Sequence, residues 1–427
     1  MEKFIIEGGI PLNGTVTPSG NKNAALPILA ACLLTDEPVI LHNVPDIQDV
    51  QNMRKLIQSL GVTIDIVDAH TWKVQAKVVR PTDLDPDLCR KIRASILLAG
   101  PGVARAKDLV LPPPGGDVIG RRRVDTHMLA LKKLGAKVNC ERSFEFHAKQ
   151  LVGADILMDE ASVTATENAI MACVLAKGTS TIRNAASEPH IQELCHFLNL
   201  LGAKISHIGS NSLKIEGVER LHGGEYTIGP DYLEVISFVG AAVVTHGTIT
   251  IKDAGVEYLD MIQLVLKRLG VTWEAKGNAI FVPAKQRLKV EMDLGGAIPT
   301  INVNTWPAFP TDLMSIAIVL ATQAKGTVLF HDWMYPSRMF FTDKLVGMGA
   351  QIVLCDPHRC IVQGPTQLMS EKMESPDIRA GMALLLASLS AKGTSIIRNV
   401  GQIDRGYERV DEKLRALGAK IERLHEE

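Results

Sequence analysis

Two isolated carboxylates stand in stretches whose composition suits chemistry on a bound substrate. Asp117 lies in LPPPGGDVIGRRRVD, residues 111–125, and Asp312 ends INVNTWPAFPTD, residues 301–312. A carboxylate held on a loop can take or give a proton as a general base or acid. Each also has an ordinary structural interpretation. Asp117 follows two glycines, as a turn former does, and Asp312 or Thr311 precedes an apolar run, as a helix N-cap does.

Basic side chains stand where they could bind an anion. Arginines occupy matching ends of several segments: Arg93, Arg121, Arg122, Arg123, Arg338, Arg379 and Arg405. A guanidinium group matches phosphate and carboxylate with two parallel hydrogen bonds. Lys22 and Asn23, in SGNKNAALP, come where a glycine turn opens a helix, although the chain has no Walker A motif. Each of these charges could equally be a solvated or ion-paired side chain.

The elements that must position these side chains belong to one unit that is repeated six times. Each copy contains the same eight-residue pattern. The pattern is an apolar residue, two variable residues, a Leu or Met, a Gly, an Ala or Val, one variable residue, and an apolar residue typical of strands. LKKLGAKV at 131–138 is one example. The six copies of the pattern contain Gly61, Gly135, Gly202, Gly270, Gly349 and Gly418. A glycine that follows the last turn of a helix is free to take a positive φ before the strand begins. The repeats therefore predict an α/β chain made of one supersecondary unit.

A second feature recurs with the same period. Small-residue apolar helices end at Gly-Thr and run into a strand at Gly178-Thr179, Gly247-Thr248, Gly326-Thr327 and Gly393-Thr394. Glu37-Pro38 and Lys107-Asp108 take the corresponding places in the other two copies. Neither helix of a repeat can bury its apolar face alone, so the copies must stack. A closed ring of three units per domain, with helices inside and sheets outside, and an open solenoid both satisfy this requirement.

Gly229-Pro230 divides the repeats three and three, because Gly-Pro is a strong break. We expect an N-terminal domain of residues 22–230, which carries a loop at 112–123, and a C-terminal domain of residues 231–427. Residues 1–21 precede the first repeat, look like a strand hairpin, and are assigned to the C-terminal domain. The loop has two glycines and few apolar residues to anchor it, so we expect it to be mobile. Two domains joined by two crossings would leave a cleft, a common place for a ligand.

Composition excludes several functional classes. The formal net charge is −1, which disfavours nucleic acid or an anionic membrane as the main partner. Seven cysteines are scattered singly without a CxxC pair, a pattern typical of reduced thiols in the cytoplasm. The N-terminal residues contain no signal-peptide apolar region, and the apolar runs fall short of a membrane span. We therefore expect a cytoplasmic protein with no nucleic-acid partner and no membrane insertion.

Six segments together resemble the enolpyruvyl transferases. They are SGNKNAALPILAA at 19–31, IRASILLAGPGVAR at 92–105, GGDVIGRRRVD at 115–125, PAFPTD at 307–312, SRMFF at 337–341 and IDRGYERVDEKLRALGA at 403–419. The resemblance covers essentially the whole chain. It implies the two-domain inside-out α/β barrel with three repeats per domain, and it is this resemblance that favours the ring over the solenoid.

The resemblance implies a reaction as well as a fold. Enolpyruvyl transferases add a hydroxyl group of an acceptor to carbon 2 of phosphoenolpyruvate, protonate carbon 3 and then eliminate phosphate, without a metal or organic cofactor. The branch that these motifs match best acts on the 3-hydroxyl of UDP-N-acetylglucosamine, the first committed step of peptidoglycan synthesis. Phosphoenolpyruvate and UDP-N-acetylglucosamine are therefore the expected substrates.

Two alternatives remain open. One is the same chemistry on shikimate 3-phosphate, for which CRKIRASILLAG lacks the expected GNAGT-type signature. The other is a repeat protein that binds a nucleotide sugar without turnover, against which the joint presence of Lys22, Asp312 and Arg405 argues. A nucleic-acid end-modifying enzyme of the same fold is disfavoured by the charge and by the lack of a basic stripe.

The resemblance also implies roles for individual residues, with Asp312 as the base that removes the hydroxyl proton. The implied catalytic set is Lys22, Asn23, Asp117, Asp312 and Arg405. Phosphoenolpyruvate would be held by Lys22, Asn23, Arg122, Arg379 and Arg405, with Arg338 and Asp377 in support. UDP-N-acetylglucosamine would contact Arg93, Arg122, Arg123, Val124, Asp125, Thr126, Ser162, Val163, Asp312 and the backbone near Met334.

Three positions depart from the family's pattern. Asp117 stands where most members carry a cysteine that can give a proton to carbon 3, a known minority variation. It implies insensitivity to fosfomycin, an epoxide antibiotic that alkylates that cysteine. Arg123 stands where Pro is usual and Thr164 where Gly is usual, both beside the expected nucleotide sugar, so they leave its pose open.

Overall fold

The computed structural model describes residues 2–80, 84–117, 119–120 and 122–425. The chain divides into two compact units: unit 1 consists of Met1–Ser19, Val118–Arg121 and Pro230–Glu427, and unit 2 of Gly20–Asp117 and Arg122–Gly229. The domain boundaries expected from the sequence, after residues 21 and 230, lie two residues and one residue from the boundaries of these units. The sequence-based division also assigned the whole loop at 112–123 to the N-terminal domain. Ile119 groups with unit 1 because its carbonyl accepts a hydrogen bond from the backbone N–H of Ser337 at 3.2 Å.

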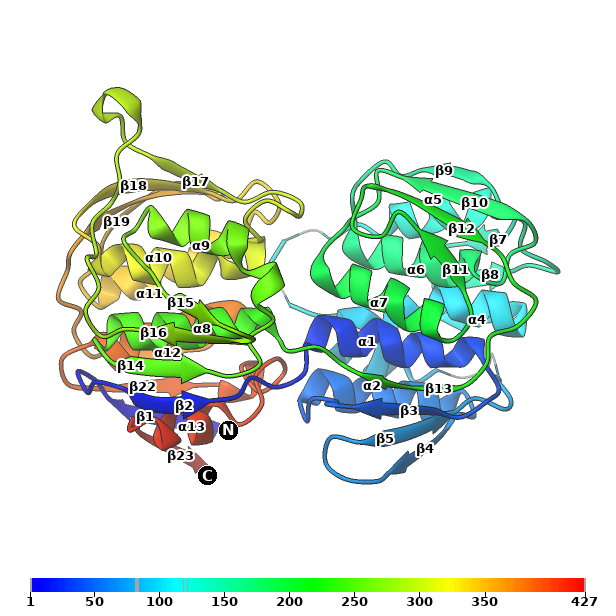
Figure 1. Ribbon diagram of the computed structural model, residues 1–427, viewed down its shortest axis with the longest axis horizontal. Helices are drawn as coiled ribbons and strands as arrows, with labels where there is room; N and C mark the ends of the chain where they lie inside the picture. Colours follow the sequence, from blue (N-terminus) through cyan, green and yellow to red (C-terminus); the bar gives the residue numbers. More distant parts are fainter. Residues whose placement is uncertain (1, 81–83, 118, 121, 426–427) are drawn as a thin grey trace. The chain divides into compact units, whose positions relative to one another are not determined.

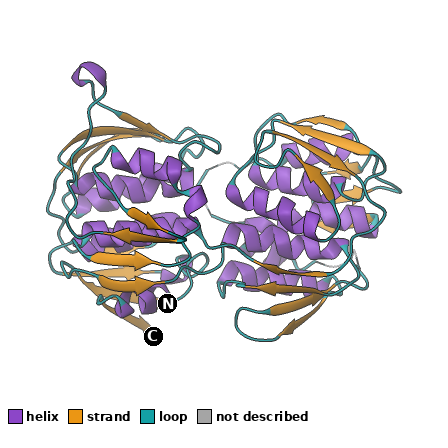
Figure 2. Cartoon of the chain, in the orientation of Figure 1, coloured by secondary structure: helices purple, strands orange, loops and turns teal. Residues whose placement is uncertain are grey.

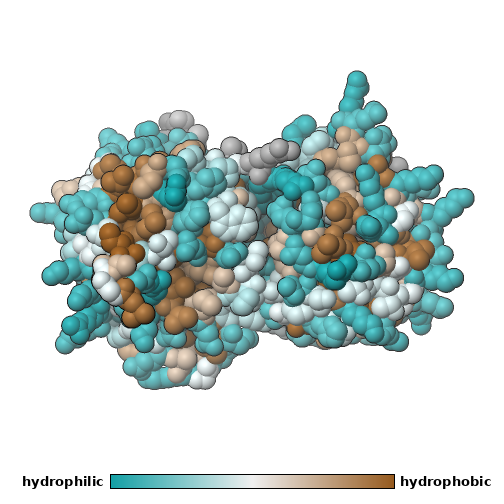
Figure 3. All heavy atoms as spheres, turned by 90° about the horizontal axis from the view of Figure 1, so that it is seen from above, coloured by the Kyte–Doolittle hydropathy of each residue, from teal (hydrophilic) through white to brown (hydrophobic). Residues whose placement is uncertain are grey.

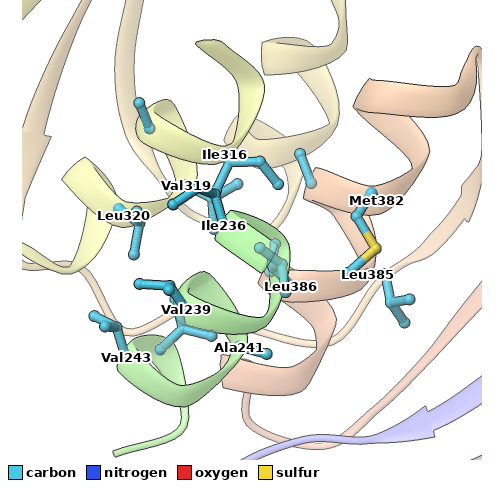
Figure 4. Close-up of a cluster of buried hydrophobic side chains, with 14 of the residues drawn as sticks. Ile236, Val239, Ala241, Val243, Ile316, Val319, Leu320, Met382, Leu385 and Leu386 are labelled. Atoms are coloured by element: carbon cyan, nitrogen blue, oxygen red, sulfur yellow. The ribbon is translucent and has the colours of Figure 1, made fainter. Parts of the chain in front are cut away.

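Three buried helices form the centre of unit 1 (Figure 1): α8 (Tyr232–Val244), α10 (Met314–Gln323) and α12 (Ile378–Ser390). Figure 4 shows side chains from all three, among them Val239, Ile316 and Leu386, gathered in one apolar cluster. The helices approach closely at Gly240, where an added Cβ would lie 2.8 Å from Leu386 and 3.3 Å from Ile316. A Cβ at Gly240 would therefore displace the end of the Leu386 side chain in a close-packed interior.

Three four-stranded sheets enclose these helices, in the orders β15-β16-β14-β2, β17-β18-β20-β19 and β21-β22-β1-β23. The strands are β1 (Glu2–Glu7), β2 (Asn13–Val16), β14 (Thr248–Ile251), β15 (Glu274–Lys276), β16 (Ala279–Val282), β17 (Thr300–Asn302), β18 (Gly326–His331), β19 (Gln351–Asp356), β20 (Arg359–Gly364), β21 (Lys372–Glu374), β22 (Thr394–Arg398) and β23 (Lys420–His425). The shorter helices are η3 (Val256–Tyr258), α9 (Asp260–Lys267), η4 (Leu294–Gly296), η5 (Thr311–Leu313), η6 (Arg338–Phe341), α11 (Thr342–Gly347), η7 (Val400–Gln402) and α13 (Val410–Ala416).

The N-terminal segment does not form the expected hairpin. β1 pairs antiparallel with β22 and β23, and β2 pairs parallel with β14, so the two strands belong to different sheets. The expectation that this segment adds strands to the C-terminal half is confirmed by the same pairings. The hairpin prediction was wrong because a local strand–turn–strand pattern does not specify whether the two strands pair with each other or with distant ones.

Unit 2 repeats the design of unit 1. Its central helices are α1 (Lys22–Ala31), α4 (Ala99–Ala106), preceded by η2 (Arg93–Leu98), and α6 (Val163–Cys173). Its sheets have the orders β13-β3-β5-β4, β6-β8-β7 and β11-β12-β10-β9. Their strands are β3 (Val39–His42), β4 (Thr63–Ile66), β5 (Trp72–Gln75), β6 (Asp108–Leu111), β7 (Lys137–Asn139), β8 (Phe144–His147), β9 (Asp155–Leu157), β10 (Thr179–Arg183), β11 (Lys204–Ser206), β12 (Ser212–Glu216) and β13 (Gly224–Thr227). The remaining helices are η1 (Cys32–Leu34), α2 (Gln48–Ser59), α3 (Pro86–Lys91), α5 (Asp125–Lys133) and α7 (Pro189–Leu200).

The recurring glycines have the predicted conformation. φ is +93° at Gly61, +94° at Gly135, +100° at Gly202, +84° at Gly270, +95° at Gly349 and +102° at Gly418. Each follows the end of a helix and precedes a strand, respectively β4, β7, β11, β15, β19 and β23. An L side chain is disfavoured in this region of backbone space, whereas glycine enters it at little cost. The prediction of six helix ends is therefore confirmed.

Helices lie inside and sheets outside in each unit, as Figure 2 shows. This confirms the inside-out α/β arrangement. On the face seen in Figure 3 hydrophilic side chains predominate, and hydrophobic ones form separate patches. The seven cysteines are free thiols, and only Cys140 and Cys355 are exposed. No helix in the described ranges is both long and apolar enough to cross a membrane.

Candidate functional site

The N-terminus of α1 carries a buried ion pair. Asn21 caps the helix, since its Oδ1 accepts hydrogen bonds from the backbone N–H groups of Asn23 at 2.8 Å and Ala24 at 3.3 Å. Lys22, the first residue of α1, places its Nζ 2.7 Å from Oδ2 of Asp49 on α2, and the two side chains are only 9% and 5% exposed. A buried ammonium group is costly without a charged partner. Asp49 therefore allows Lys22 to remain charged at the end of a helix.

The turn before Asp117 packs against Arg93 and Arg122. A Cβ added to Gly115 would lie 1.6 Å from the carbonyl oxygen of Arg90. Gly116 has φ +106°, and its added Cβ would lie 2.8 Å from Cβ of Arg93 and 3.3 Å from Nη1 of Arg122. Only glycine fits such close approaches of backbone to neighbouring atoms. This packing places the backbone that leads to half-buried Asp117 beside two of the predicted anion-binding arginines.

Arg93 also holds the segment that follows the loop. Its Nη2 donates to the carbonyl oxygens of Arg122 at 2.9 Å and Arg123 at 2.8 Å. The Arg123 side chain, 43% exposed, is ion-paired with Asp125 at 3.2 Å and with Asp159 at 2.9 Å. These pairs contribute little stability at an exposed site. They do occupy the guanidinium group that the resemblance assigned to the nucleotide sugar.

Other residues assigned to the nucleotide sugar surround the first turns of α5 and α6. Val124 is the N-cap residue of α5, and Asp125 is its first residue. Thr126 donates its hydroxyl to Oδ1 of Asp159 at 2.7 Å. Ser162 caps α6, and Val163 is that helix's first residue. Unpaired backbone N–H groups at helix N-termini favour anions, so these ends suit phosphate groups.

A buried histidine joins these two helices. Gly100 donates its N–H to Oδ1 of Asn168 at 2.6 Å, which fixes the amide so that Nδ2 donates to Nδ1 of His127 at 2.8 Å. Nε2 of His127, 3.1 Å from Oγ1 of Thr164, then carries the proton. Burial, with a smaller contribution from the Arg93 charge, lowers the pKa of His127 to about 3. The imidazole is therefore neutral at pH 7. Thr164, one of the three departures, thus has a structural partner.

In unit 1, Asp312 lies between two buried arginines. Its Oδ1 accepts from Nη2 of Arg338 at 3.0 Å, and its Oδ2 accepts from Nε of Arg379 at 3.2 Å. The Asp312 side chain is 29% exposed, whereas those of Arg338 and Arg379 are 4% and 6% exposed. The N-cap positions of η5 and α10 are Pro310 and Leu313. The N-cap interpretation of Asp312 and Thr311 is therefore wrong.

Burial opposes the charge of both arginines, and nearby carboxylates restore it. Burial would lower the pKa of Arg338, but the charges of Asp312, Asp377 and Asp332 raise it above its ordinary value. For Arg379 burial acts in the same direction, and Tyr407, Asp312 and Asp231 raise the pKa. Both guanidinium groups are therefore firmly charged.

One buried donor nitrogen of Arg379, Nη1, is unsatisfied within the described part of the chain. The Arg379 guanidinium carbon lies 5.5 Å from the centre of the Tyr407 ring. An unsatisfied buried donor costs roughly 1–3 kcal/mol. An anionic ligand that accepted from Nη1 would remove this cost.

The ends of α12 and the 403–409 loop place the remaining predicted residues. Asp377 caps α12, and its Oδ1 accepts from the N–H groups of Arg379 and Ala380 at 2.8 and 2.9 Å. Nη1 of Arg405 donates to Oε1 of Gln402 at 3.0 Å. The preceding residue, Asp404, is held by both Nη atoms of Arg423 at 2.8 and 2.7 Å. Arg405 therefore sits on a loop anchored to β23.

The structure brings some of the predicted residues together in each unit, whereas Lys22, Asn23, Asp117 and Arg405 belong to neither of the two groups. Within unit 2 the structure joins Arg93, Arg122, Arg123, Asp125 and Thr126, and it links α6 to them through His127. Within unit 1 it joins Asp312, Arg338, Arg379 and Asp377. Arg121 lies outside the described residues. Sequence reasoning missed Asp49, His127, Asp159, Asp332 and Tyr407. Asp49, His127, Asp332 and Tyr407 are buried polar residues, whereas Asp159 is exposed and carries no signal in the sequence.

The chemistry available in these groups is that of anion binding and proton transfer. Cationic side chains lie at the N-terminal ends of buried helices, where the helix dipole also favours negative charge. The two carboxylates assigned to proton transfer, Asp117 in unit 2 and Asp312 in unit 1, are both at least partly exposed. Among the described residues, no three His, Cys, Asp or Glu side chains are grouped so that they could hold a metal ion.

Comparison with known proteins gives consistent results. The model of the EPSP synthase family (3-phosphoshikimate 1-carboxyvinyltransferase) matches residues 6–414. A protein from Treponema denticola named UDP-N-acetylglucosamine 1-carboxyvinyltransferase is 54% identical and covers 99% of both chains. A protein of the same name from Bradyrhizobium diazoefficiens is 55% identical and covers 99% of this chain and 98% of its own.

Solved structures show the same fold. The crystal structure of the enolpyruvyl transferase NikO from Streptomyces tendae matches with a TM-score of 0.89 at 23% identity, and covers 100% of this chain and 99% of that one. EPSP synthase from Acinetobacter baumannii matches with a TM-score of 0.77 at 16% identity over the full length of both chains. At these identities the likeness establishes the architecture alone.

Proposed function

Since this chain belongs to the EPSP synthase family, we propose that it transfers the enolpyruvyl group of phosphoenolpyruvate to the 3-hydroxyl of UDP-N-acetylglucosamine. The observation that carries this proposal is the identity of 54–55%, over nearly full length, to relatives whose name states both the acceptor and the carboxyvinyl group. The match to the EPSP synthase family alone leaves shikimate 3-phosphate possible as acceptor. The identity to the named relatives favours the nucleotide sugar.

The reaction requires three proton transfers. The acceptor oxygen forms a bond to carbon 2 of phosphoenolpyruvate as its hydroxyl proton leaves, and carbon 3 gains a proton. In the second step carbon 3 loses a proton, the bond from carbon 2 to the phosphate oxygen breaks, and phosphate leaves. We assign the first deprotonation to Asp312, because it is a partly exposed carboxylate held rigidly by Arg338 and Arg379. A base oriented in this way acts without first reorganising its surroundings.

The anionic groups of phosphoenolpyruvate need cationic partners throughout the reaction. Lys22, Asn23, Arg122, Arg379 and Arg405 are assigned to this role. Nη1 of Arg379, which has no partner among the described residues, supports the assignment. Lys22 supports it as well, because it places an ammonium group with three N–H donors at the N-terminus of α1.

The acceptor is assigned to the residues around α5 and α6 and near Met334. Arg93, Arg123, Thr126, Ser162 and Val163 supply side-chain and backbone donors in unit 2. The ion pairs of Arg123 with Asp125 and Asp159 must rearrange or remain at the rim when a diphosphate binds. In unit 1 the backbone at Met334 completes the assignment.

We assign the proton donation to carbon 3 to Asp117. A free Asp has a pKa of about 3.9, so at pH 7 only about one molecule in 10³ is protonated, a penalty of roughly 4 kcal/mol. The donating form is the neutral carboxylic acid, so this step requires Asp117 to be protonated in the complex with both substrates. Residue 117 offers no thiol, so fosfomycin has nothing to alkylate at this position.

Phosphate release with alternative acceptors tests the proposal. The purified chain is incubated with phosphoenolpyruvate and either UDP-N-acetylglucosamine or shikimate 3-phosphate. We expect phosphate release with the nucleotide sugar alone. Release only with shikimate 3-phosphate would overturn the acceptor assignment, and nucleotide-sugar binding without release would favour a non-catalytic binding protein.

The biological role follows from the acceptor. An enolpyruvyl derivative of UDP-N-acetylglucosamine is a precursor of peptidoglycan, so we place the chain in cell-wall synthesis in the cytoplasm. Expression of the chain in bacteria depleted of their own UDP-N-acetylglucosamine 1-carboxyvinyltransferase should restore growth. Failure of an expressed, folded chain to do so would count against this role.

A further inference from the structure

A buried carboxylate that none of the assignments above uses lies directly after β18. Asp332 is fully buried. Its Oδ1 accepts hydrogen bonds from the backbone N–H groups of Met334 at 3.0 Å and Tyr335 at 3.2 Å. Its Oδ2 accepts the hydroxyl of Thr311 at 2.5 Å. One side chain therefore contacts two segments that lie far apart in the sequence.

Both segments belong to unit 1 and carry residues that are assigned to the proposed reaction. Thr311 directly precedes Asp312, the proposed base, in η5. Met334 lies where the backbone is assigned to the acceptor. The carboxylate of Asp332 thus connects the turn that carries the base with the backbone that holds the substrate whose proton the base removes.

Asp332 itself is rigidly held. Its backbone N–H donates to the carbonyl of His358 at 2.8 Å, and its carbonyl accepts from Nδ1 of His358 at 2.7 Å. Next to it, Nε1 of Trp333 donates to the carbonyl of Val303 at 3.0 Å. The backbone that carries this carboxylate is therefore fixed. Hydrogen bonds to a charged acceptor are also stronger than those to a neutral one. A rigid support of this sort is what a site needs to hold reacting groups to within a fraction of an ångström.

We propose that Asp332 is a positioning residue that sets the location of Asp312 relative to the acceptor's 3-hydroxyl through Thr311 and the N–H groups of Met334 and Tyr335. This inference rests on the proposed function. Asp332 has no contact with substrate in this scheme and takes no part in proton transfer. Its effect is on the alignment of oxygen, proton and base.

Removal of the Thr311 hydroxyl group tests its hydrogen bond to Asp332 separately from the other contacts of Asp332. Thr311→Val keeps the shape of the side chain and loses its hydrogen bond to Asp332, whereas Thr311→Ser keeps the hydroxyl. We expect Thr311→Val to lower kcat by roughly 10- to 100-fold, because a small misplacement of reacting groups costs up to about that much. The KM for phosphoenolpyruvate should stay within about twofold of wild type, since no assigned phosphoenolpyruvate ligand is touched. Thr311→Ser should restore most of kcat.

A control variant separates alignment from the general cost of losing a hydroxyl hydrogen bond. Thr342 is buried in unit 1, whereas Thr311 is half-buried, and the Thr342 hydroxyl donates to the carbonyl of Met339 at 2.7 Å. Thr342→Val should lower the thermal midpoint to a similar extent as Thr311→Val but leave kcat unchanged. If both variants lose kcat in proportion to their stability, Thr311 has only a structural role and the inference is wrong.

A double-mutant cycle tests whether the effect passes through Asp332. Asp332→Asn keeps an oxygen for the two N–H groups but removes the charge. If Thr311 acts through Asp332, the double variant should lose no more kcat than the worse single variant. Additive losses would show that Thr311 acts independently, and unchanged kcat in Thr311→Val would overturn the inference outright. Both results presuppose an active wild type. An inactive wild type refutes the proposed function itself, and this inference with it.

Discussion

Replacement of Asp312 by Asn is the sharpest test of the proposed chemistry. Asn has nearly the same size as Asp, and its Oδ1 can still accept from one arginine. Its Nδ2, however, would face the guanidinium group of the other arginine, and no hydrogen bond can form because both are donors. The Asn side chain also cannot accept the hydroxyl proton. Arg338 and Arg379 are almost fully buried, so each would lose one compensating carboxylate, while Asp377 and Asp332 remain near Arg338 and Tyr407 and Asp231 remain near Arg379.

Two magnitudes follow, and they can be separated. A hydrogen bond to a charged group contributes about 1.5–3 kcal/mol, so the lost arginine contact should lower the stability of unit 1 by roughly that amount. Removal of a general base typically lowers turnover by about 10²–10⁴-fold. That loss corresponds to roughly 3–5 kcal/mol in the activation barrier. Since domains are commonly stable by about 5–15 kcal/mol, the variant should remain folded at 25 °C while it loses activity.

The assay is steady-state phosphate release across pH, together with urea unfolding. Wild type should lose kcat on the acidic side as the base becomes protonated, and Asp312→Asn should lack that limb. Asp343→Asn is the control, because the Asp343 side chain is 83% exposed in the same unit and should change neither quantity. A kcat of Asp312→Asn within about threefold of wild type, with the acidic limb retained, would refute the assignment of the base.

Three further expectations concern buried or reactive side chains. Asp117→Asn should lose most activity and Asp117→Cys should keep some. Mass spectrometry after fosfomycin treatment should show an adduct at residue 117 only in the cysteine variant, and an inactivating adduct in wild type would contradict the assignment. The pKa of His127 is lowered from 6.5 to about 3 by burial, so its stabilising effect is lost as pH falls below 6.5. Urea unfolding at pH 7 and pH 5 should show a loss that is smaller in His127→Gln by about 2 kcal/mol, and equal losses would refute it. Burial and the charge of Glu188 raise the pKa of Glu167 well above 4.5, so wild type should lose stability as pH rises above that value. Glu167→Gln should lack this component in the same unfolding series, and an unchanged pH dependence would show that Glu167 is not its source.

The repeat architecture could be predicted because it depends on local rules. A helix that ends before a strand needs a residue with positive φ, so Gly61 and its five equivalents mark the helix ends independently of tertiary structure. Strand pairing depends on distant partners instead. The pattern around β1 and β2 predicted strands correctly and their partners incorrectly, because β22, β23 and β14 are encoded far along the chain.

The candidate site shows the same division. The types of residue expected at an anion site, such as Arg379 and Lys22, could be selected from the sequence, since few other residues bind phosphate well. Their partners could not. Asp49 lies on the next helix, and Asp332 lies 21 residues from the Thr311 hydroxyl that it accepts. Pairs of this kind form only when the surrounding elements pack, so no spacing rule reveals them.

The position of β1 within its sheet has a consequence for how the chain acquires its structure during synthesis. β1 is an internal strand, between β22 and β23, so its partners leave the ribosome only at the end of translation. Unit 2, by contrast, is formed by residues between Gly20 and Gly229, and its internal contacts join residues that are already synthesised when Gly229 emerges. Unit 2 can therefore fold while unit 1 is still being made, whereas β1 must wait, with unpaired backbone groups that invite wrong pairing. Deletion of Glu2–Glu7 would leave β22 and β23 without the strand that joins them in their sheet.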